Sequence, residues 1–159
     1  MVKAKDLLIL THFRKNSRIS LTKLSKATKI PISTIFDRLK SNEDGIIIRH
    51  TSLIDFSKLG YNVKVQIALK APKDKKEEIR EFLLKNERIN SVYRITNGYD
   101  FLVEGIFRGI VESEGFIEIL QDRFDVKEIK PFFVIEDIMR EKFMSDPQMV
   151  LMHYPKSTS

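Results

Sequence analysis

The sequence predicts an α+β protein with a helical front domain and a mixed domain behind it. Up to about residue 43 the apolar side chains recur at helical spacing, whereas from Tyr61 they alternate with polar ones, as in a half-buried strand. Charge follows the same division, because residues 1–54 hold 11 Lys and Arg against 4 Asp and Glu, and residues 55–159 hold 17 against 18. We therefore expect domains over residues 1–54 and 61–143, a linker at 55–60 and a tail at 144–159.

Three short helices are predicted in the front domain. The first covers residues 4–15, and a second begins after Ser20, whose side chain suits an N-cap, and ends near Thr28. Pro31 stands at the entry to the third helix, where proline is tolerated, and Gly45 closes it. The inward side chains of the first two helices are Ile9, Leu10, Phe13, Leu21 and Leu24. Three such helices around a small core, with a polar face on the third, make a helix-turn-helix, the arrangement that enters a DNA major groove.

The third helix divides into two faces on a wheel of about 100° per residue. The apolar arc holds Ile32, Ile35, Phe36 and Leu39. The opposite face holds Ser33, Thr34, Asp37, Arg38 and Ser41, with Lys40 at its edge. Hydroxyl, carboxylate and guanidinium groups of this kind can bind base edges or phosphates, although the same face also suits an ordinary solvated helix.

The remaining chain predicts a βαββαβ domain. The run "GIIIRHTSLIDF" at residues 45–56 is rich in β-branched residues and is predicted as strand and linker, which gives the front domain a winged-helix-like character. Strands are then predicted at 63–70, 89–96, 101–107 and 129–137, and helices from just after the "APKD" at 71–74 to about residue 85 and at 110–124. This order is the ferredoxin-like plan, in which two helices cover one face of a four-stranded antiparallel sheet.

A second copy of the chain is predicted to cover the other face of the sheet. We expect more large apolar side chains than two helices cover, namely Phe101, Val103, Phe107, Phe132 and Phe133. A homodimer that buries sheet surface follows from this excess.

Composition argues against an enzyme and against a membrane protein. The chain has no Cys, its three His residues are scattered, and no Gly-rich phosphate loop is present, so we expect no catalytic residues, no metal and no cofactor. The apolar run in "MVKAKDLLILTHF" is too short for a signal or a membrane segment, and we place the protein in the cytoplasm. The net charge of +6, concentrated at the front, favours a nucleic acid over a membrane surface as the partner.

Several motifs together resemble the leucine-responsive regulatory protein/AsnC (Lrp/AsnC) family of transcription regulators. They are Asp6 with Ile9, Leu10 and Phe13; "RIS" at 18–20; "STI" with Arg38 and Leu39; "GII" from Gly45; "ID" and "KLGY" in the linker; and "NGYDF" at 97–101. The resemblance implies a sequence-specific regulator that binds double-stranded DNA, forms dimers that can assemble into octamers, and responds to an amino acid or related small effector.

The chain departs from the family pattern near the third helix. Lys29 replaces the usual Gly of the inter-helix turn, Pro31 replaces a capping Ser, Asn42 replaces a Leu, and "NEDG" is one residue shorter than the usual segment. We expect the third helix to end early as a result. These departures bear on the target sequence and on the affinity, and they leave the DNA-binding assignment in place.

The polar face and the resemblance together give two sets of candidate site residues. The predicted DNA-binding residues are Ser20, Lys23, Ser33, Thr34, Asp37, Arg38, Lys40, Ser41 and Arg49. The predicted effector-binding residues are Gly98, Tyr99 and Asp100, where backbone N–H groups and a carboxylate could hold a zwitterion, although "NGYD" also suits a simple strand-to-strand turn.

Two other functions share parts of this pattern. RNA-recognition modules have the same βαββαβ order, but they stack bases on aromatic residues of the central strands, and the outward set of the first strand is Lys64, Gln66, Ala68 and Lys70. A free-standing amino-acid sensor that acts through protein contacts would need no DNA site.

Overall fold

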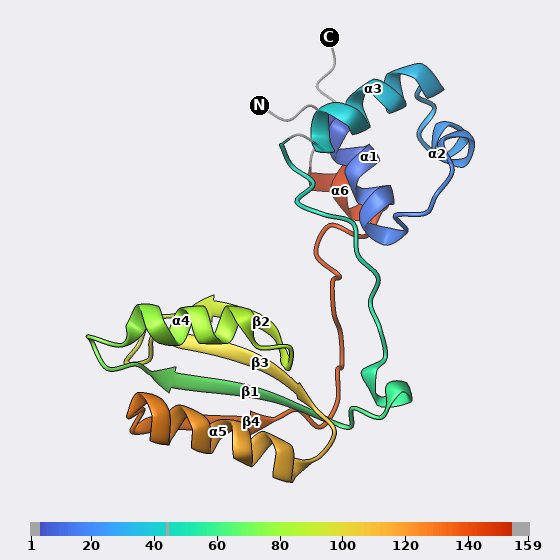
Figure 1. Cartoon of the computed structure of the whole chain (residues 1–159). Coiled ribbons are helices and arrows are strands. Elements are labelled where there is room, and N and C mark those ends of the chain that lie inside the picture. The colour runs from blue at the N-terminus through green and yellow to red at the C-terminus, as the bar shows by residue number, and fades with distance from the viewer. Residues whose placement is uncertain (1–3, 44, 154–159) are drawn as a thin grey trace. The chain divides into compact units, whose positions relative to one another are not determined.

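The computed structural model describes residues 4–43 and 45–153, so the predicted ends of the front domain and of the tail, at residues 1–3 and 154–159, lie outside the described residues. The described chain forms two compact units (Figure 1). The helical unit contains residues up to 52 together with residues from 138 onward, and the sheet unit contains residues 53–137. The predicted boundary at residue 143 therefore lies within the C-terminal part of the helical unit.

The helical unit contains four helices: α1 (Ala4–Lys15), α2 (Leu21–Thr28), α3 (Ile32–Glu43) and α6 (Pro147–His153). The predicted N-cap is confirmed, because the Ser20 hydroxyl accepts a hydrogen bond from the Lys23 N–H at 3.3 Å. Buried side chains from α1, α2 and α3 and the turn before α3 form one small core, namely Ile9, Leu24, Ile30, Ile35 and Leu39. The three predicted front helices are thus present.

The prediction that the third helix ends early is wrong. α3 continues to Glu43, and the Asn42 carbonyl then accepts hydrogen bonds from the N–H groups of Gly45, Ile46 and Ile47 at 3.2, 2.7 and 2.8 Å. This cluster of bonds satisfies a terminal carbonyl of the helix and turns the chain away from it. Asn42 itself is buried.

The strand predicted within residues 45–56 is absent from the described structure. Residues 47–55 have no regular secondary structure, and the Ile48 side chain is 97% exposed. A strand needs a neighbouring strand for its backbone N–H and C=O groups, and the described chain offers none to this segment. A high content of β-branched residues was therefore insufficient to form a strand here.

The C-terminal segment packs on the first helix of the helical unit. Helix α6 contacts α1, and the Arg14 guanidinium of α1 forms an ion pair with Glu141 at 2.6 Å. Arg14 Nε also donates to the Phe143 carbonyl at 2.6 Å. The tail that we expected to be peripheral is therefore attached, through residues 141–153, to the helices that precede the sheet.

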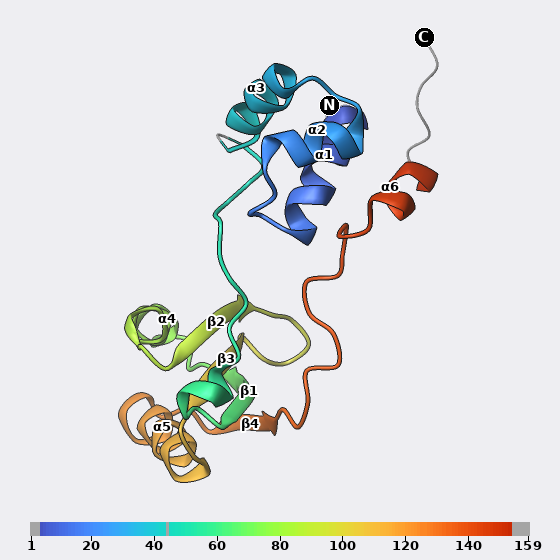
Figure 2. The same ribbon diagram turned by 90° about the vertical axis from the view of Figure 1, so that its right-hand side faces the viewer.

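The sheet unit has the predicted βαββαβ order. After a short 3₁₀-helix at Phe56–Leu59, its elements are β1 (Val63–Lys70), α4 (Lys76–Lys85), β2 (Ile89–Arg94), β3 (Phe101–Phe107), α5 (Ile110–Phe124) and β4 (Glu128–Phe133). The strands are antiparallel in the order β2-β3-β1-β4, which confirms the ferredoxin-like plan. Figure 2 shows α4 and α5 on the same side of the sheet, so the opposite face carries no helix of this unit.

The helices α4 and α5 cover more of the large apolar side chains of the sheet than we expected. Phe101, Val103 and Phe107 are buried under α4 and α5, so these three do not contribute to an uncovered face. Phe132 and Phe133 on the edge strand β4 are 56% and 42% exposed, but Phe133 pairs with the buried Val65, so only Phe132 lies on the helix-free face. Of the five predicted residues, Phe132 alone therefore adds exposed apolar surface to the helix-free face, which is less than we expected.

Lys29 provides a direct test of the turn between α2 and α3. It adopts a left-handed conformation with φ of 60°, and its N–H donates to the Ser25 carbonyl at 2.9 Å. Only glycine adopts this conformation without steric cost, so Lys29→Gly should stabilise the helical unit by about 1 kcal/mol. The matched change Lys26→Gly, within α2, should destabilise the unit by about 1 kcal/mol. Hydrogen exchange of the α2 and α3 amides measures both effects, and shifts in the same direction would contradict this account of the turn.

Candidate functional site

The orientation of α3 decides which of its side chains meet a partner. Ile35 and Leu39 are buried in the core, with 0% and 8% exposure. Ile32 and Phe36, which we expected in the same buried arc, are 45% and 57% exposed. The prediction for these two residues is therefore wrong, and α3 presents an apolar pair to solvent.

Arg38 is turned inward and forms an ion pair with α1. Its Nη1 donates to Asp6 Oδ1 at 2.5 Å, and only 25% of its side chain and 14% of that of Asp6 are exposed. The pair links α1 to α3 across 32 positions of sequence. Arg38 thus holds α3 in its orientation, and only a fraction of its guanidinium faces solvent.

Most of the predicted DNA-binding residues lie on the surface of the helical unit. Thr34 and Arg38 are partly buried, and the others are exposed: Ser20, Lys23, Ser33, Asp37, Lys40, Ser41 and Arg49. The exposed face of α3 consists of Ile32, Ser33, Phe36, Asp37, Lys40 and Ser41, which we call the α3 outer face. The structure thus groups four predicted residues with the two apolar residues that the sequence assigned to the core.

Asn42 explains why the sequence placed Ile32 and Phe36 inside. It is 6% exposed and lies on the same side of α3 as Ile35 and Leu39, so a polar residue occupies a core position. On a wheel of 100° per residue, the predicted apolar arc of Ile32, Ile35, Phe36 and Leu39 is centred roughly 45° away from the side that is buried. That side is formed by Ile35, Leu39 and Asn42. The family pattern, which has Leu at position 42, is the signal that could have identified residue 42 as part of the buried side.

The predicted effector loop is a tight turn between β2 and β3. Asn97 and Gly98 have positive φ values of 66° and 92°, and the Ile95 N–H donates to the Asp100 carbonyl at 3.0 Å. Positive φ at both central residues is the requirement that Asn-Gly meets in hairpin turns. The turn conformation proposed for "NGYD" is therefore confirmed, and Tyr99 next to it lies with its ring 5.8 Å from the Lys130 ammonium.

Both carboxylate oxygens of Asp100 are engaged within the sheet unit. Oδ2 accepts from the Ala71 N–H at 2.9 Å, and Oδ1 accepts from the Lys76 ammonium at 2.5 Å. The hydrogen bond from Lys76 is the main cause that lowers the pKa of the Asp100 carboxyl below its ordinary value. Asp100 thus ties the start of β3 to the connection between β1 and α4.

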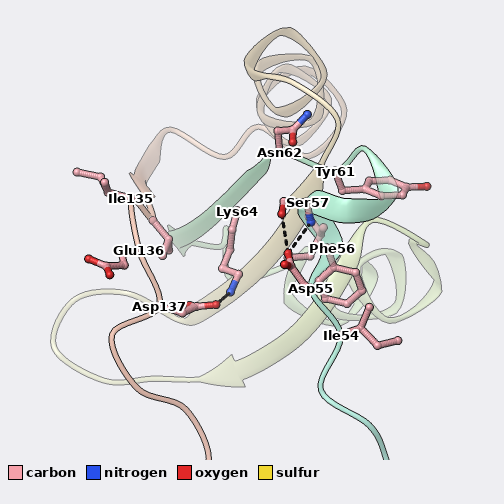
Figure 3. Close-up of a pocket in the computed structure, with 12 residues that line it drawn as sticks. Ile54, Asp55, Phe56, Ser57, Tyr61, Asn62, Lys64, Ile135, Glu136 and Asp137 are labelled. Carbon is pink, nitrogen blue, oxygen red and sulfur yellow. Dashed lines mark hydrogen bonds and ion pairs between the residues drawn. The ribbon is translucent and has the colours of Figure 1, made fainter.

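A small cavity lies at the opposite end of β1 from this loop. It measures about 150 Å³, and two short segments flank it, residues 54–57 and 134–137 (Figure 3). Lys64 forms an ion pair with Asp137, and Asp55 accepts from the Ser57 N–H and hydroxyl. Ligand pockets usually measure about 300–1,000 Å³, and these polar groups already bond one another. We assign the cavity to anchoring the two segments on the sheet.

The architecture and its exposed surfaces define a class of protein. A helix-turn-helix unit with a basic surface, joined to a βαββαβ unit with a defined loop, is the construction of a DNA-binding regulator with a separate ligand-binding domain. Residues 62–143 match the model of the Lrp/AsnC ligand binding domain, and residues 3–41 match a winged helix-turn-helix DNA-binding model. The chain belongs to the Lrp/AsnC family of transcription regulators.

Individual relatives support this assignment. The uncharacterized HTH-type transcriptional regulator PH1692 of Pyrococcus horikoshii is 30% identical over 145 residues, which cover 91% of this chain and 97% of that protein. The regulator NMB0573 from Neisseria meningitidis, solved as an L-Met complex, superposes with a TM-score of 0.82 at 22% identity and covers 88% of this chain and 94% of its own. Bacillus subtilis LrpC superposes with a TM-score of 0.80 at 21% identity, and the match covers 87% of this chain and 98% of LrpC. At such identities the two structures establish the fold alone.

Two negative findings apply to the described residues. None of the helices in residues 4–43 and 45–153 is long and apolar enough to cross a membrane. The same part of the chain has no group of three or more His, Asp or Glu side chains placed to hold a metal ion. The family is one of transcription regulators.

Replacement of Asp100 tests its structural role. Asp100→Ala should lower the free energy of unfolding by about 1.5–3 kcal/mol, because the Ala71 N–H and the Lys76 ammonium lose their acceptor. Asp100→Asn removes the charge but keeps an oxygen for Ala71. Urea unfolding measures both, with Asp74→Ala, an exposed residue of the same loop, as the control. Equal stability of Asp100→Ala and the control would contradict the role.

The pH dependence of the same variants has a defined sign. The pKa of Asp100 is lowered in the folded protein, so its charge contributes stability above the unfolded value of about 3.8, and this contribution is lost as pH falls through the folded pKa. The stability difference between wild type and Asp100→Asn should therefore be full at neutral pH and shrink below about pH 4.

Proposed function

We propose that the protein binds duplex DNA with the α3 outer face in the major groove and with basic side chains of the helical unit on the phosphates. The observation that carries this proposal is the exposure of Ser33, Asp37 and Lys40 along one side of α3, beside the exposed Lys23 of α2. Residues near the N-terminus of a recognition helix contact base edges, and lysines nearby neutralise phosphates. Arg38 is partly buried and holds α3 to α1 through its ion pair with Asp6, and Thr34 is partly buried as well.

An amino acid or related small molecule is proposed as the effector of the sheet unit. The support is the ligand-binding description of the matched domain, the L-Met complex of the Neisseria regulator, and the loop at Gly98, Tyr99 and Asp100. Asp100 and Lys76 form a partly buried ion pair, with 23% and 44% of their side chains exposed. A zwitterion could bind between them, with its ammonium on Asp100 and its carboxylate on Lys76, so that two ion pairs replace one.

A homodimer is proposed to form through the helix-free face of the sheet. Tyr93 of β2 and Phe132 of β4 are 55% and 56% exposed. Their cross-strand partners, Leu102 for Tyr93 and Gln66 for Phe132, place both rings on this face. Dimers give two reading helices, and further assembly to an octamer would give more. An effector that changes their arrangement would change which half-sites are bound together.

The two alternative functions have less support. RNA-recognition modules need aromatic residues on the central strands, and the helix-free face of β1 and β3 carries Leu102, Glu104 and Ile106 beside the four residues already named. A sensor acting only through protein contacts would not need the basic excess of residues 1–54. We also propose a cytoplasmic location for this regulator, and the proposed mechanism needs no cofactor.

Salt titration tests the proposed contact with phosphates. Affinity for a duplex should fall by orders of magnitude between about 50 and 200 mM salt, because bound phosphates release counterions. Lys40→Ala should weaken binding and reduce the slope of log affinity against log salt by about one. Lys127→Ala, which changes an exposed lysine of the sheet unit, is the matched control and should leave the slope unchanged. Affinity that barely responds to salt would reject the proposed contact and favour the sensor.

Mass measurement tests the dimer surface. Phe132→Glu should convert the dimer to a monomer at micromolar concentration, because it places a charge within the proposed apolar interface. Val111→Glu changes a residue of α5 that is 87% exposed and should leave the mass unchanged. Sedimentation of the two variants distinguishes the faces, and an unchanged mass for Phe132→Glu would show that the copies associate elsewhere.

A further inference from the structure

The α3 outer face has an apolar half that the proposed phosphate and polar contacts do not use. Phe36 is 57% exposed and Ile32 is 45% exposed, and they lie four residues apart on adjacent turns of α3. Neither is needed for the core of the helical unit, which Ile35 and Leu39 fill from the other side. Two large apolar side chains in the first turns of a reading helix are therefore available to a partner.

The chemistry of the major groove supplies one apolar group. Among the base edges displayed there, only thymine presents a methyl group, at C5, and the others present hydrogen-bond donors and acceptors. Phenylalanine is one of the side chains that make apolar contacts with this methyl group. Ile32 and Phe36 also occupy the first part of α3, the part of a recognition helix that reaches base edges.

Charge favours DNA over a second copy of the chain as the occupant. Exposed lysines lie close to the apolar pair along the chain: Lys23 and Lys26 on α2, Lys29 in the turn, and Lys40 one turn beyond Phe36. Two copies facing each other through this surface would bring these cations together. Duplex DNA complements the lysines with its phosphates and the apolar pair with the methyl groups in its major groove.

We propose that Phe36, supported by Ile32, reads the C5 methyl of thymine and so makes this regulator prefer A·T pairs at defined positions of its half-site. The inference rests on the proposed entry of α3 into the major groove. Phe36 is thereby a specificity-determining residue, whereas Lys40 contributes to affinity for any sequence. The polar residues between them, Ser33 and Asp37, face the same groove and are free to contact neighbouring bases.

Replacement of thymine by uracil removes only the methyl group and leaves every hydrogen bond of the pair in place. The probe is a duplex that the wild-type protein selects from a random pool, with deoxyuridine substituted for one thymine at a time. At one or two positions of each half-site, this substitution should weaken wild-type binding by about three- to tenfold, because a buried methyl group is lost. The same substitution should have no effect on Phe36→Ala, whose affinity for the thymine duplex is already reduced.

Lys40→Ala is the matched variant. It should bind both duplexes more weakly and keep the thymine-to-uracil ratio of the wild type, because it alters only a cation on the same face. Phe36→Leu, which keeps an apolar side chain, should retain part of the ratio. Circular dichroism and sedimentation of Phe36→Ala should match the wild type, since the side chain is exposed and lies outside the proposed dimer face.

The outcomes separate this inference from the function on which it rests. If the wild type selects a duplex but no uracil substitution affects it more than it affects Phe36→Ala, the thymine contact is rejected and the DNA-binding function stands. If Phe36→Ala changes the mass of the protein and leaves DNA affinity intact, the apolar pair is an interface between copies, which also rejects the contact. If the wild type selects no duplex, the proposed function fails and the inference fails with it.

Discussion

The ion pair between Asp6 and Arg38 determines which face of α3 a partner meets. Its 2.5 Å hydrogen bond joins the first and third helices and is largely shielded from water. With Arg38 held toward α1, and with Ile35 and Leu39 in the core, Phe36 and Lys40 must point outward. If α3 were rotated about its axis by one residue position, about 100°, different side chains would face the bases. The proposed specificity of the protein therefore depends on a contact formed within the helical unit.

In the sheet unit, Asp100 has a structural role and a proposed binding role at the same time. Asp100 joins the β2–β3 turn to the connection between β1 and α4 through Ala71 and Lys76. The same carboxylate is the group that the family resemblance assigns to an effector. Structural and binding roles are compatible here because a carboxylate has about four lone-pair sites, of which the two observed bonds use only part. An effector that displaced Lys76 would change the local links at this end of the sheet without unfolding it.

Much of the fold could be predicted from the sequence because its signals are local. Ser20 caps α2, Gly98 permits the hairpin turn, and the alternation from Val63 to Lys70 marks β1, each through interactions within a few residues. The features that were missed depend on distant contacts. Asn42 occupies a core position, and Arg14 forms an ion pair with Glu141 across 127 positions of sequence. Neither feature produces a periodic pattern of apolar residues in the sequence.

The candidate site was predicted in part for the same reason. Ser33, Asp37 and Lys40 were placed on the surface because polar residues at helical spacing mark an exposed face. The apolar members of that face, Ile32 and Phe36, were assigned to the core because hydrophobicity alone does not distinguish burial within the monomer from burial against a partner. Only the rotation of α3 in the folded unit reveals the difference.

The central claim is that two copies of this chain read a defined duplex sequence through paired α3 helices. Selection of bound fragments from random duplex DNA, with the full chain at moderate salt, tests that claim most directly. The account predicts enrichment of a sequence with two related half-sites on one face of the duplex, about 10 base pairs or a multiple of 10 apart. A bound pool indistinguishable in sequence from the starting pool, obtained with folded dimeric protein, would contradict it.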